Sequence, residues 1–155
     1  MSTPDAPALQ FAFRIAITVA PPLVIGETGV GLRRVVNITG GTVAGPRLNG
    51  RVLAGGADVQ LIRPGGLTDI AARYVIEAND GALIAVENTG LRHGPPGAMA
   101  KIQRGEYVDP ALMYFRTAPR FETGAPGYAW MARSLFVARA ARFPERVEIA
   151  VFEVG

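Results

Sequence analysis

The chain contains no cysteine, and among its 155 residues there is one histidine, His93. Without cysteine there is no disulfide framework, thiolate nucleophile, zinc ribbon or iron–sulfur cluster. His93 lies in the loop-like stretch RHGPPG, and neither Ser2 nor Ser134 has the context of a nucleophile elbow, which argues against a serine–histidine–acid triad. A metal site would need mainly carboxylates, and no acidic cluster is present, so we predict neither a metal nor a cofactor.

Long apolar runs and basic clusters are also missing. No stretch approaches the roughly 20 apolar residues of a membrane span, and the N-terminus MSTPDAPALQ lacks the basic start and apolar core of a signal peptide. The net charge is +3, but the arginines are scattered from Arg14 to Arg146 and Lys101 is the only lysine. Nucleic-acid binding requires a concentrated basic surface. The sequence therefore predicts a cytoplasmic protein that binds neither a membrane nor nucleic acid.

What the sequence does contain is a large share of apolar residues. Hydrophobic residues make up 49% of the chain and charged residues 19%. This composition is typical of folded proteins rather than disordered ones, and the chain is long enough to bury one hydrophobic core without disulfides. We expect a single domain over residues 1–155, in which residues 1–8 form a flexible N-terminal tail.

Apolar and polar residues alternate as β-strands require. In LQFAFRIAITV, residues 9–19, apolar side chains recur at every second position. In ARYVIEANDGALIAVENTG, two β-rich runs meet at Asn79-Asp80-Gly81, and an Asp-Gly pair suits the positive φ angles of a tight hairpin turn. Further strands are predicted around residues 33–38, 114–117, 128–138 and 146–154, with one short helix between residues 98 and 112.

Glycines are frequent in the first half of the chain, at positions 40, 41, 45, 50, 55, 56, 65 and 66. Glycine within strands permits the bulges and coiling with which a sheet closes on itself. Many short strands with little helical periodicity indicate an all-β fold, and the glycines favour a single antiparallel β-barrel, with at most one short helix, over a sandwich. A barrel of about eight strands is either filled by side chains or holds one small ligand.

One stretch combines residues that neither a core nor a surface loop usually combines. MYFRTAPRFETGAPGYAW, residues 113–130, brings Tyr114, Tyr128 and Trp130 together with Arg116 and Glu122. Aromatic rings interspersed with charged groups are typical of the wall of a partly apolar cavity. We therefore expect this stretch to line a ligand pocket.

Other polar residues lie within apolar strands: Asp58 after AGGA, Arg73 and Tyr74 in AARYVI, and Asn88 at the end of LIAVEN. Burying a charge is costly unless the charge is paired, so the charged residues also have an ordinary interpretation, as solvent-facing groups or ion pairs at the barrel ends. The alternation groups Tyr74 and Asn88 with the apolar face and places Arg73 opposite. Which face lines the interior stays open, because both carry apolar residues.

Three segments together resemble the domain-of-unknown-function 3237 family of bacterial and fungal proteins: GVGLRRVVNITGGTVAGPRLNGRVLAGGADVQLIRPGG, ARYVIEANDGALIAVENTG and MYFRTAPRFETGAPGYAWMARSLFVA. The most specific pieces are Gly-Gly-Ala-Asp at 55–58, Arg73-Tyr74, Asp80-Gly81, Tyr114-Phe115-Arg116-Thr117, Phe121-Glu122-Thr123, and Tyr128 with Trp130. Val59 departs from the aromatic residue expected after the aspartate, which would alter the shape of the pocket. The resemblance implies a lipocalin-like or allene-oxide-cyclase-like barrel, often a homo-oligomer, with no established general activity.

These residues favour a cofactor-independent isomerase, cyclase or lyase that transfers a proton on a small apolar or aromatic carbonyl compound. Asp58 or Glu122 would be the acid or base, and Arg73 and Arg116 would stabilise an oxyanion or carboxylate. The residues expected to orient the ligand are Tyr74, Asn88, Tyr114, Tyr128 and Trp130. Two alternatives stay open: a non-catalytic binding or carrier protein with the same cavity, and a structural protein whose aromatic residues simply fill the barrel.

Overall fold

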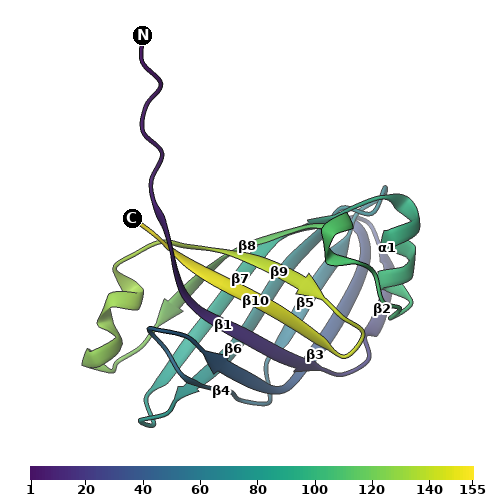
Figure 1. The fold of residues 1–155 in the computed structure, drawn as a ribbon. Coiled ribbons are helices and arrows are strands. Elements are labelled where there is room, and N and C mark those ends of the chain that lie inside the picture. Colours follow the sequence, from purple (N-terminus) through teal and green to yellow (C-terminus); the bar gives the residue numbers. More distant parts are fainter.

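The computed structural model describes residues 1–155, and most of the chain is β-structure (Figure 1). The strands are β1 (Leu9–Val19), β2 (Leu23–Thr28), β3 (Gly31–Ala44), β4 (Gly50–Val52), β5 (Ala57–Ile62), β6 (Thr68–Ala78), β7 (Leu83–His93), β8 (Tyr114–Glu122), β9 (Phe136–Arg142) and β10 (Arg146–Val154). The helix α1 (Pro96–Gln103) and a short 3-10 helix (Pro110–Leu112) follow β7, and a second 3-10 helix (Pro126–Ala132) follows β8.

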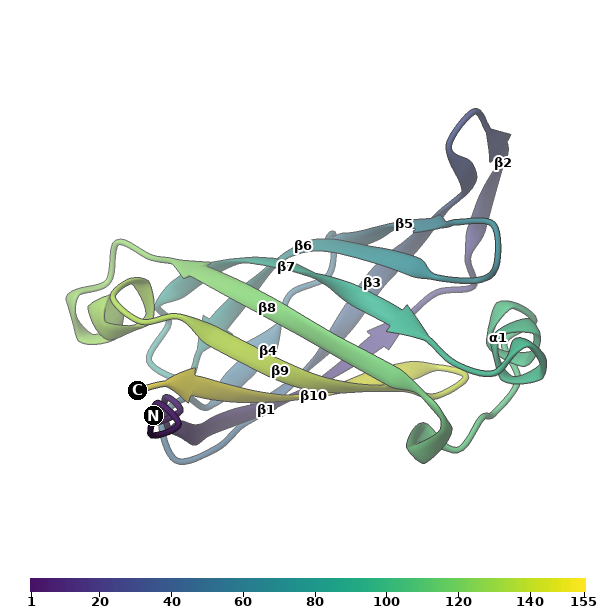
Figure 2. The same cartoon turned by 90° about the horizontal axis from the view of Figure 1, so that it is seen from above.

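All strand pairs are antiparallel, and the sheet closes on itself. β1 pairs with β10 on one side and with β3 on the other. β3 reaches β6 through β4 and β5, which lie end to end between them. The fold is a closed eight-stranded antiparallel barrel with two extra strands, of which β2 extends the wall along β3 beyond the end of β1 (Figure 2). The predicted all-β barrel is confirmed.

The hairpin of β6 and β7 follows directly from the sequence pattern. Burial alternates along both strands, so that every second side chain enters the barrel. At the turn, only Gly81 has a positive φ, of 89°, while Asn79 and Asp80 do not. The connection is therefore a three-residue loop closed by a left-handed glycine, rather than a turn with positive φ at two residues.

The segment after β8 differs from the expectation of a strand over residues 128–138. Residues Pro126–Ala132 form a 3-10 helix, and β9 begins only at Phe136. Proline is favoured at the first position of a helix, because its fixed φ suits the turn and no amide hydrogen is needed there. Proline also stands at the start of α1, at Pro96. The strand β8 ends at Glu122, five residues past its predicted end at Thr117.

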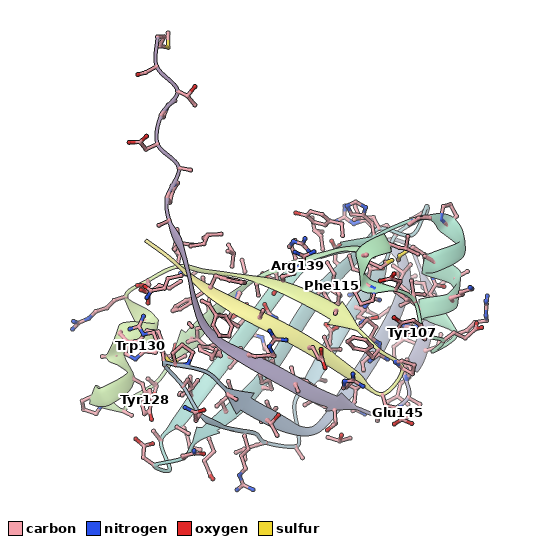
Figure 3. All side chains as sticks on the ribbon, in the orientation of Figure 1. Tyr107, Phe115, Tyr128, Trp130, Arg139 and Glu145 are labelled. Atoms are coloured by element: carbon pink, nitrogen blue, oxygen red, sulfur yellow. The ribbon has the colours of Figure 1, made fainter.

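The half of the barrel farthest from α1 is filled by aromatic side chains. The ring of Phe121 lies edge-on to Phe13, with centroids 5.6 Å apart, and to Phe136, at 5.1 Å. Trp130 packs against Phe136 at 6.0 Å, and it lies with Tyr128 at this end of the molecule (Figure 3). In this half, the phenylalanine rings pack with aliphatic side chains in the interior of the barrel.

The N-terminal residues before β1 are exposed and lie away from the barrel wall (Figure 1). None of the helices is long and apolar enough to cross a membrane.

Candidate functional site

A cavity of about 40 Å³ occupies the half of the barrel nearest α1. One wall is apolar and comes from β1, β3 and β10; its residues are Ile17, Val19, Val36, Ile38, Val147 and Ile149. The opposite wall comes from β5 to β9 and is polar; its polar residues are Asp58, Gln60, Tyr74, Asn88, Arg92, Thr117 and Arg142. A guest in this space would meet hydrophobic surface on one side and charges and hydrogen-bonding groups on the other.

The polar wall follows from the two-residue period of the strands. Asp58 and Gln60 are two residues apart on β5, and Asn88 and Arg92 are four apart on β7, so each pair shares the inward face. Gly56 lets β5 begin close to β6, because a Cβ at this position would lie 2.5 Å from both the carbonyl oxygen of Arg73 and the Cβ of Tyr74.

Asp58 is the only carboxylate that lines the cavity. The pairing of β5 with β6 is interrupted between Asp58 and Leu61, and there the Ala71 amide donates to Asp58 Oδ1 at 3.0 Å. Gln60 Nε2 donates to Oδ2 at 2.8 Å. Desolvation raises the pKa of the Asp58 carboxyl, while these two hydrogen bonds and the charges of Arg92 and Arg142 act in the opposite direction. The carboxyl is thus held in place and has a proton affinity above that of an exposed aspartate.

Three arginines surround this carboxyl. Arg92 is 1% exposed, and its guanidinium lies 5.3 Å from the centroid of the Phe115 ring. Arg34, 3% exposed, donates from Nη1 to the carbonyl oxygen of Gln103 at 3.1 Å, which ties the C-terminal end of α1 to the barrel. Arg142 is half-buried on β9.

Burial shapes the ionisation of these groups. Desolvation lowers the pKa of Arg92 to about 10 and also lowers those of Arg34 and Arg142. Arg92 nevertheless stays protonated at neutral pH. Desolvation also raises the pKa of Tyr74, so its phenol keeps its proton and is available to donate a hydrogen bond to a guest.

Many polar atoms around the cavity have no hydrogen-bond partner within the protein. The buried side-chain atoms of this kind are Arg34 Nε, Gln60 Oε1, Tyr74 OH, Asn88 Oδ1, Arg92 Nε and Nη2, Thr117 Oγ1 and Arg142 Nη1. All belong to cavity-lining residues or to Arg34. Buried polar groups are normally paired, and leaving them unpaired costs stability. Their concentration here marks the cavity as the candidate site.

Three of the residues predicted from the sequence line the cavity: Asp58, Tyr74 and Asn88. Arg73 and Glu122 do not. Arg73 is exposed on the outer face of β6 and forms an ion pair with Glu87 at 3.4 Å, and Glu122 is exposed on the outer face of β8. The expectation that they share an enclosed space with Asp58 is corrected, because odd-numbered residues of β6 and even-numbered residues of β8 face outward.

The expectation that residues 113–130 line the pocket is also corrected. Only Phe115 and Thr117 of this stretch reach the cavity. Tyr114 is 47% exposed and stacks on His93 with centroids 4.9 Å apart, and the Arg116 guanidinium lies 5.3 Å from the Tyr114 ring on the same outer face.

Tyr128 and Trp130 lie at the opposite end of the barrel from the cavity (Figure 3). The Tyr128 hydroxyl donates to Asp80 Oδ2 at 3.0 Å, and the Arg47 guanidinium lies 3.7 Å from the Trp130 ring centroid. These contacts connect the 3-10 helix Pro126–Ala132 to neighbouring loops, and they give both aromatic residues a structural explanation.

Several site residues escaped the sequence analysis: Arg34, Gln60, Arg92, Thr117 and Arg142. A signal existed for two of them, because Gln60 and Arg92 share the strand faces of Asp58 and Asn88. Arg142 required knowledge of where β9 starts. Val59 is 41% exposed on the outer face of β5, so its departure from an aromatic residue does not shape the cavity.

No group of three or more histidine, aspartate or glutamate side chains converges anywhere in the chain in a way that would hold a metal ion. The cavity wall combines one carboxyl with two guanidinium groups, a phenol and two amides, and the guanidinium of Arg34 lies behind it. This set of groups can exchange a proton and bind an oxyanion.

Comparison with known proteins identifies relatives along the full length of the chain. A UPF0311 protein from Rhodopseudomonas palustris is 47% identical over 145 residues, which cover 94% of this chain and 95% of the relative. A UPF0311 protein from Clostridium acetobutylicum is 44% identical over 144 residues, which cover 92% and 91%. A hydroalkoxylation enzyme, phnH, from the fungus Penicillium herquei is 32% identical over 85 residues, which cover 55% of this chain and 56% of the enzyme.

Solved structures have the same fold as this chain. The crystal structure of a conserved protein of unknown function from R. palustris superposes with a TM-score of 0.94 at 45% identity, covering 99% of this chain and 100% of that one. A beta-barrel like protein from Acinetobacter baumannii gives 0.86 at 34% identity, with full coverage of both chains. A crystal structure of an enzyme from P. herquei, with a TM-score of 0.75 at 21% identity over 100% of this chain and 99% of that one, shares the fold. The family model described as "Protein of unknown function (DUF3237)" matches residues 7–154, and the chain belongs to this family.

Proposed function

We propose that the protein is a cofactor-independent enzyme that transfers a proton on a small apolar or aromatic carbonyl compound bound inside the barrel. The observation that carries this proposal is a single carboxyl, Asp58, which shares a cavity with the guanidinium groups of Arg92 and Arg142 and with polar atoms that have no partner in the protein. Enzymes often leave groups unsatisfied at sites that substrate later occupies, at a cost in stability.

Asp58 is the acid/base of the proposed reaction. Its carboxylate takes a proton from a carbon next to the substrate carbonyl; the electron pair of the broken C–H bond forms a C=C bond, and the π pair of the carbonyl moves onto the oxygen. The enolate then takes the proton back at a different atom, or expels or captures a group, which gives isomerisation, elimination or cyclisation. A carboxyl whose proton affinity is raised by desolvation suits both steps, the removal of the proton from carbon and its return to the enolate.

Arg92, Tyr74 and Asn88 have complementary roles. Arg92 and the protonated phenol of Tyr74 donate to the oxygen on which negative charge develops, and the low dielectric of the cavity strengthens both interactions. The amide of Asn88 orients the substrate through its free Oδ1. The apolar wall of β1, β3 and β10 receives the hydrophobic part of the guest.

The fungal relative supports this class of reaction. Hydroalkoxylation adds an O–H group across a C=C double bond: an O–H bond and the C=C π bond break, while a C–O and a C–H bond form. The net change is a proton transfer coupled to ring or ether formation, and a positioned acid/base can promote it. The similarity to the hydroalkoxylation enzyme of P. herquei covers 55% of this chain, so it favours the reaction class and does not identify the substrate.

A non-catalytic carrier is the second candidate, because the same lining of apolar and unpaired polar groups can hold a guest without chemistry. A volume of about 40 Å³ is far below the range of about 300–1,000 Å³ typical of sites for drug-sized ligands. A guest with an aromatic ring therefore requires the cavity to widen by a rearrangement of its lining side chains. Such a rearrangement is compatible with tight storage as well as with turnover.

Hydrogen–deuterium exchange at carbon distinguishes the two candidates. The protein is incubated in D₂O with phenylacetone and with phenylpyruvate, and loss of the α-C–H signals is followed by proton NMR. We expect the wild-type protein to accelerate exchange and Asp58→Asn to abolish the acceleration. Glu122→Gln is the matched control, because it removes an exposed carboxylate outside the cavity and should exchange like wild type.

Two outcomes contradict an enzyme. If Asp58→Asn accelerates exchange as well as wild type does, Asp58 is not the acid/base. If the wild-type protein binds either compound, detected by a shift in melting temperature, but does not accelerate exchange, the carrier is the better description.

A further inference from the structure

We propose that the natural guest of the cavity is an organic anion, a carboxylate or a phenolate, held by Arg92 and Arg142 with Arg34 behind them. This inference rests on the proposed function in treating the cavity as a ligand site, and it adds the charge of the ligand. It derives from the way the chain distributes its arginines and carboxylates between the outside and the inside of the barrel.

On the outside, six of the twelve arginines have carboxylate partners. Six ion pairs lie on the surface, and their members are Arg47–Glu153, Arg51–Glu77, Arg63–Asp69, Arg73–Glu87, Arg104–Glu106 and Arg146–Glu148. Exposed ion pairs contribute little to stability, because water already solvates the charges. The carboxylates are therefore placed where charge neutralisation is worth least.

The arginines inside the barrel have no carboxylate partner within ion-pair distance. None of Arg34, Arg92 and Arg142 forms an ion pair, although Arg34 and Arg92 are almost fully buried. The only carboxylate on the cavity wall is Asp58, whose two oxygens already accept from the Ala71 amide and the Gln60 side chain. Two positive charges on the cavity wall, with Arg34 behind them, thus meet one negative charge, which leaves an excess of positive charge.

This excess is costly without a guest. A buried guanidinium without an anionic partner loses its hydration and gains little in return. Arg92 makes only a cation–π contact with Phe115, and its Nε and Nη2 have no acceptor. Arg142 Nη1 also lacks an acceptor and lies on the same cavity wall. Two guanidinium groups with free N–H donors form a natural receptor for the two oxygens of a carboxylate or for a phenolate oxygen.

The polarity of the rest of the cavity agrees with such a guest. An anionic head group at Arg92 and Arg142 leaves the apolar wall formed by Ile17, Ile38 and Ile149 for a ring or alkyl portion. The Tyr74 phenol and the Thr117 hydroxyl, neither of which has a partner in the protein, can donate to the same head group.

The test compares ligands that differ in charge but hardly in shape. Acetate against acetamide and benzoate against benzamide are titrated into the protein, and affinity is followed by calorimetry and by the shift in melting temperature. We expect both anions to bind and each neutral amide to bind at least about tenfold more weakly, which corresponds to about 1.4 kcal/mol. Equal affinity for benzoate and benzamide, or no binding of either anion at millimolar concentration, overturns the proposal.

Two variants on one strand locate the effect. Arg142→Gln removes a guanidinium that faces the cavity, and we expect it to lower the affinity for benzoate about tenfold or more. Arg139→Gln on the outer face of β9, where the side chain points away from the barrel (Figure 3), should leave it unchanged. Equal losses in both variants would mean that the anion responds to the overall charge of the protein and not to this site.

Asp58→Asn separates this proposal from the proposed function. It removes the negative charge from the cavity, so benzoate should bind at least as tightly as to wild type, while the proton exchange described above is lost. If anion binding disappears together with exchange, the charge argument fails. If anion binding behaves as expected but wild type shows no exchange, the anion site stands and the catalytic proposal fails.

Discussion

Two carboxylic acids show how position within the fold decides the chemistry of a residue. Asp58 and Glu122 both lie in strands, and each has an apolar residue beside it in the sequence. Asp58 faces the cavity among three arginines, whereas Glu122 faces solvent on the outer wall. Desolvation raises the pKa of Asp58 above that of an exposed aspartate, which shifts the carboxyl toward the range that acid/base catalysis uses.

The raised pKa of Asp58 implies a particular dependence of stability on pH. A carboxyl with a higher pKa in the folded state than in the unfolded state binds its proton more readily when folded. Its contribution to the free energy of unfolding is therefore lost as pH rises from the ordinary value of 3.8 through the raised folded value. We expect the stability of wild type minus that of Asp58→Asn to fall across this range, measured by urea denaturation. A difference that grows with pH would show a depressed pKa.

Tyr74 allows a separate test of the unpaired groups. Its hydroxyl is buried without a partner, so Tyr74→Phe removes no hydrogen bond and should leave the free energy of unfolding unchanged within about 0.5 kcal/mol or raise it. Affinity for a ligand that uses the hydroxyl should fall at the same time.

Tyr128→Phe is the control for Tyr74→Phe, because it breaks the hydrogen bond to Asp80. We expect it to cost about 0.5–1 kcal/mol in chemical denaturation. A loss larger than this in Tyr74→Phe would mean that its hydroxyl is paired.

At the scale of elements, the junction between β4 and β5 positions the site. β5 begins beside β6 only because Gly56 has no side chain, and Asp58 follows two residues later on the inward face. Beyond Asp58 the ladder with β6 is interrupted, and the Ala71 amide donates to the carboxylate. The backbone thus lets β5 approach β6 closely and supplies one hydrogen-bond donor to the Asp58 carboxylate.

Gly56→Ala should disturb this junction. The added Cβ would lie 2.5 Å from the carbonyl oxygen of Arg73, a backbone atom that has little freedom to move. We expect a loss of about 1–3 kcal/mol in the free energy of unfolding. Gly97→Ala in α1 is the matched control, since nothing lies within 4 Å of its Cβ position. It should stabilise the protein by about 0.4–1 kcal/mol. Equal effects of the two substitutions would show that β5 can shift at no cost.

At the scale of the whole molecule, one barrel combines a packed half with a hollow half. Around Phe121 the aromatic rings interlock, and around Asp58 the space is left for a guest. The solid half stabilises the fold and can offset the cost of the unpaired groups in the other half. The homo-oligomer expected from the family resemblance stays a prediction, which sedimentation velocity would test.

The two halves should respond differently to the loss of a phenyl ring. Phe121→Ala should cost about 3–5 kcal/mol, because the neighbouring rings of Phe13 and Phe136 cannot close the gap. Phe115→Ala should cost less, since one side of its ring already borders the cavity. Both values come from denaturant titration monitored by circular dichroism. Equal costs would indicate that the cavity is filled by side chains in solution.

Most of the strands, the β6–β7 hairpin and the all-β barrel could be predicted from the sequence, because alternation and turn residues are local signals. Local signals also placed Tyr74 and Asn88 on one face. They failed for residues 113–130, where rings and charges adjacent in sequence alternate between the outer wall, the cavity and the far end of the barrel.

Only the tertiary structure decided which residues meet. Arg34, Asp58, Arg92 and Arg142 are far apart in the sequence and belong to four different strands, and closure of the barrel brings them around one space. The period of a strand determines which side chains share a face, but the register between strands and the direction of curvature determine which face is enclosed. For this reason the fold class could be predicted from the sequence, whereas the positively charged interior can be recognised only in the closed barrel.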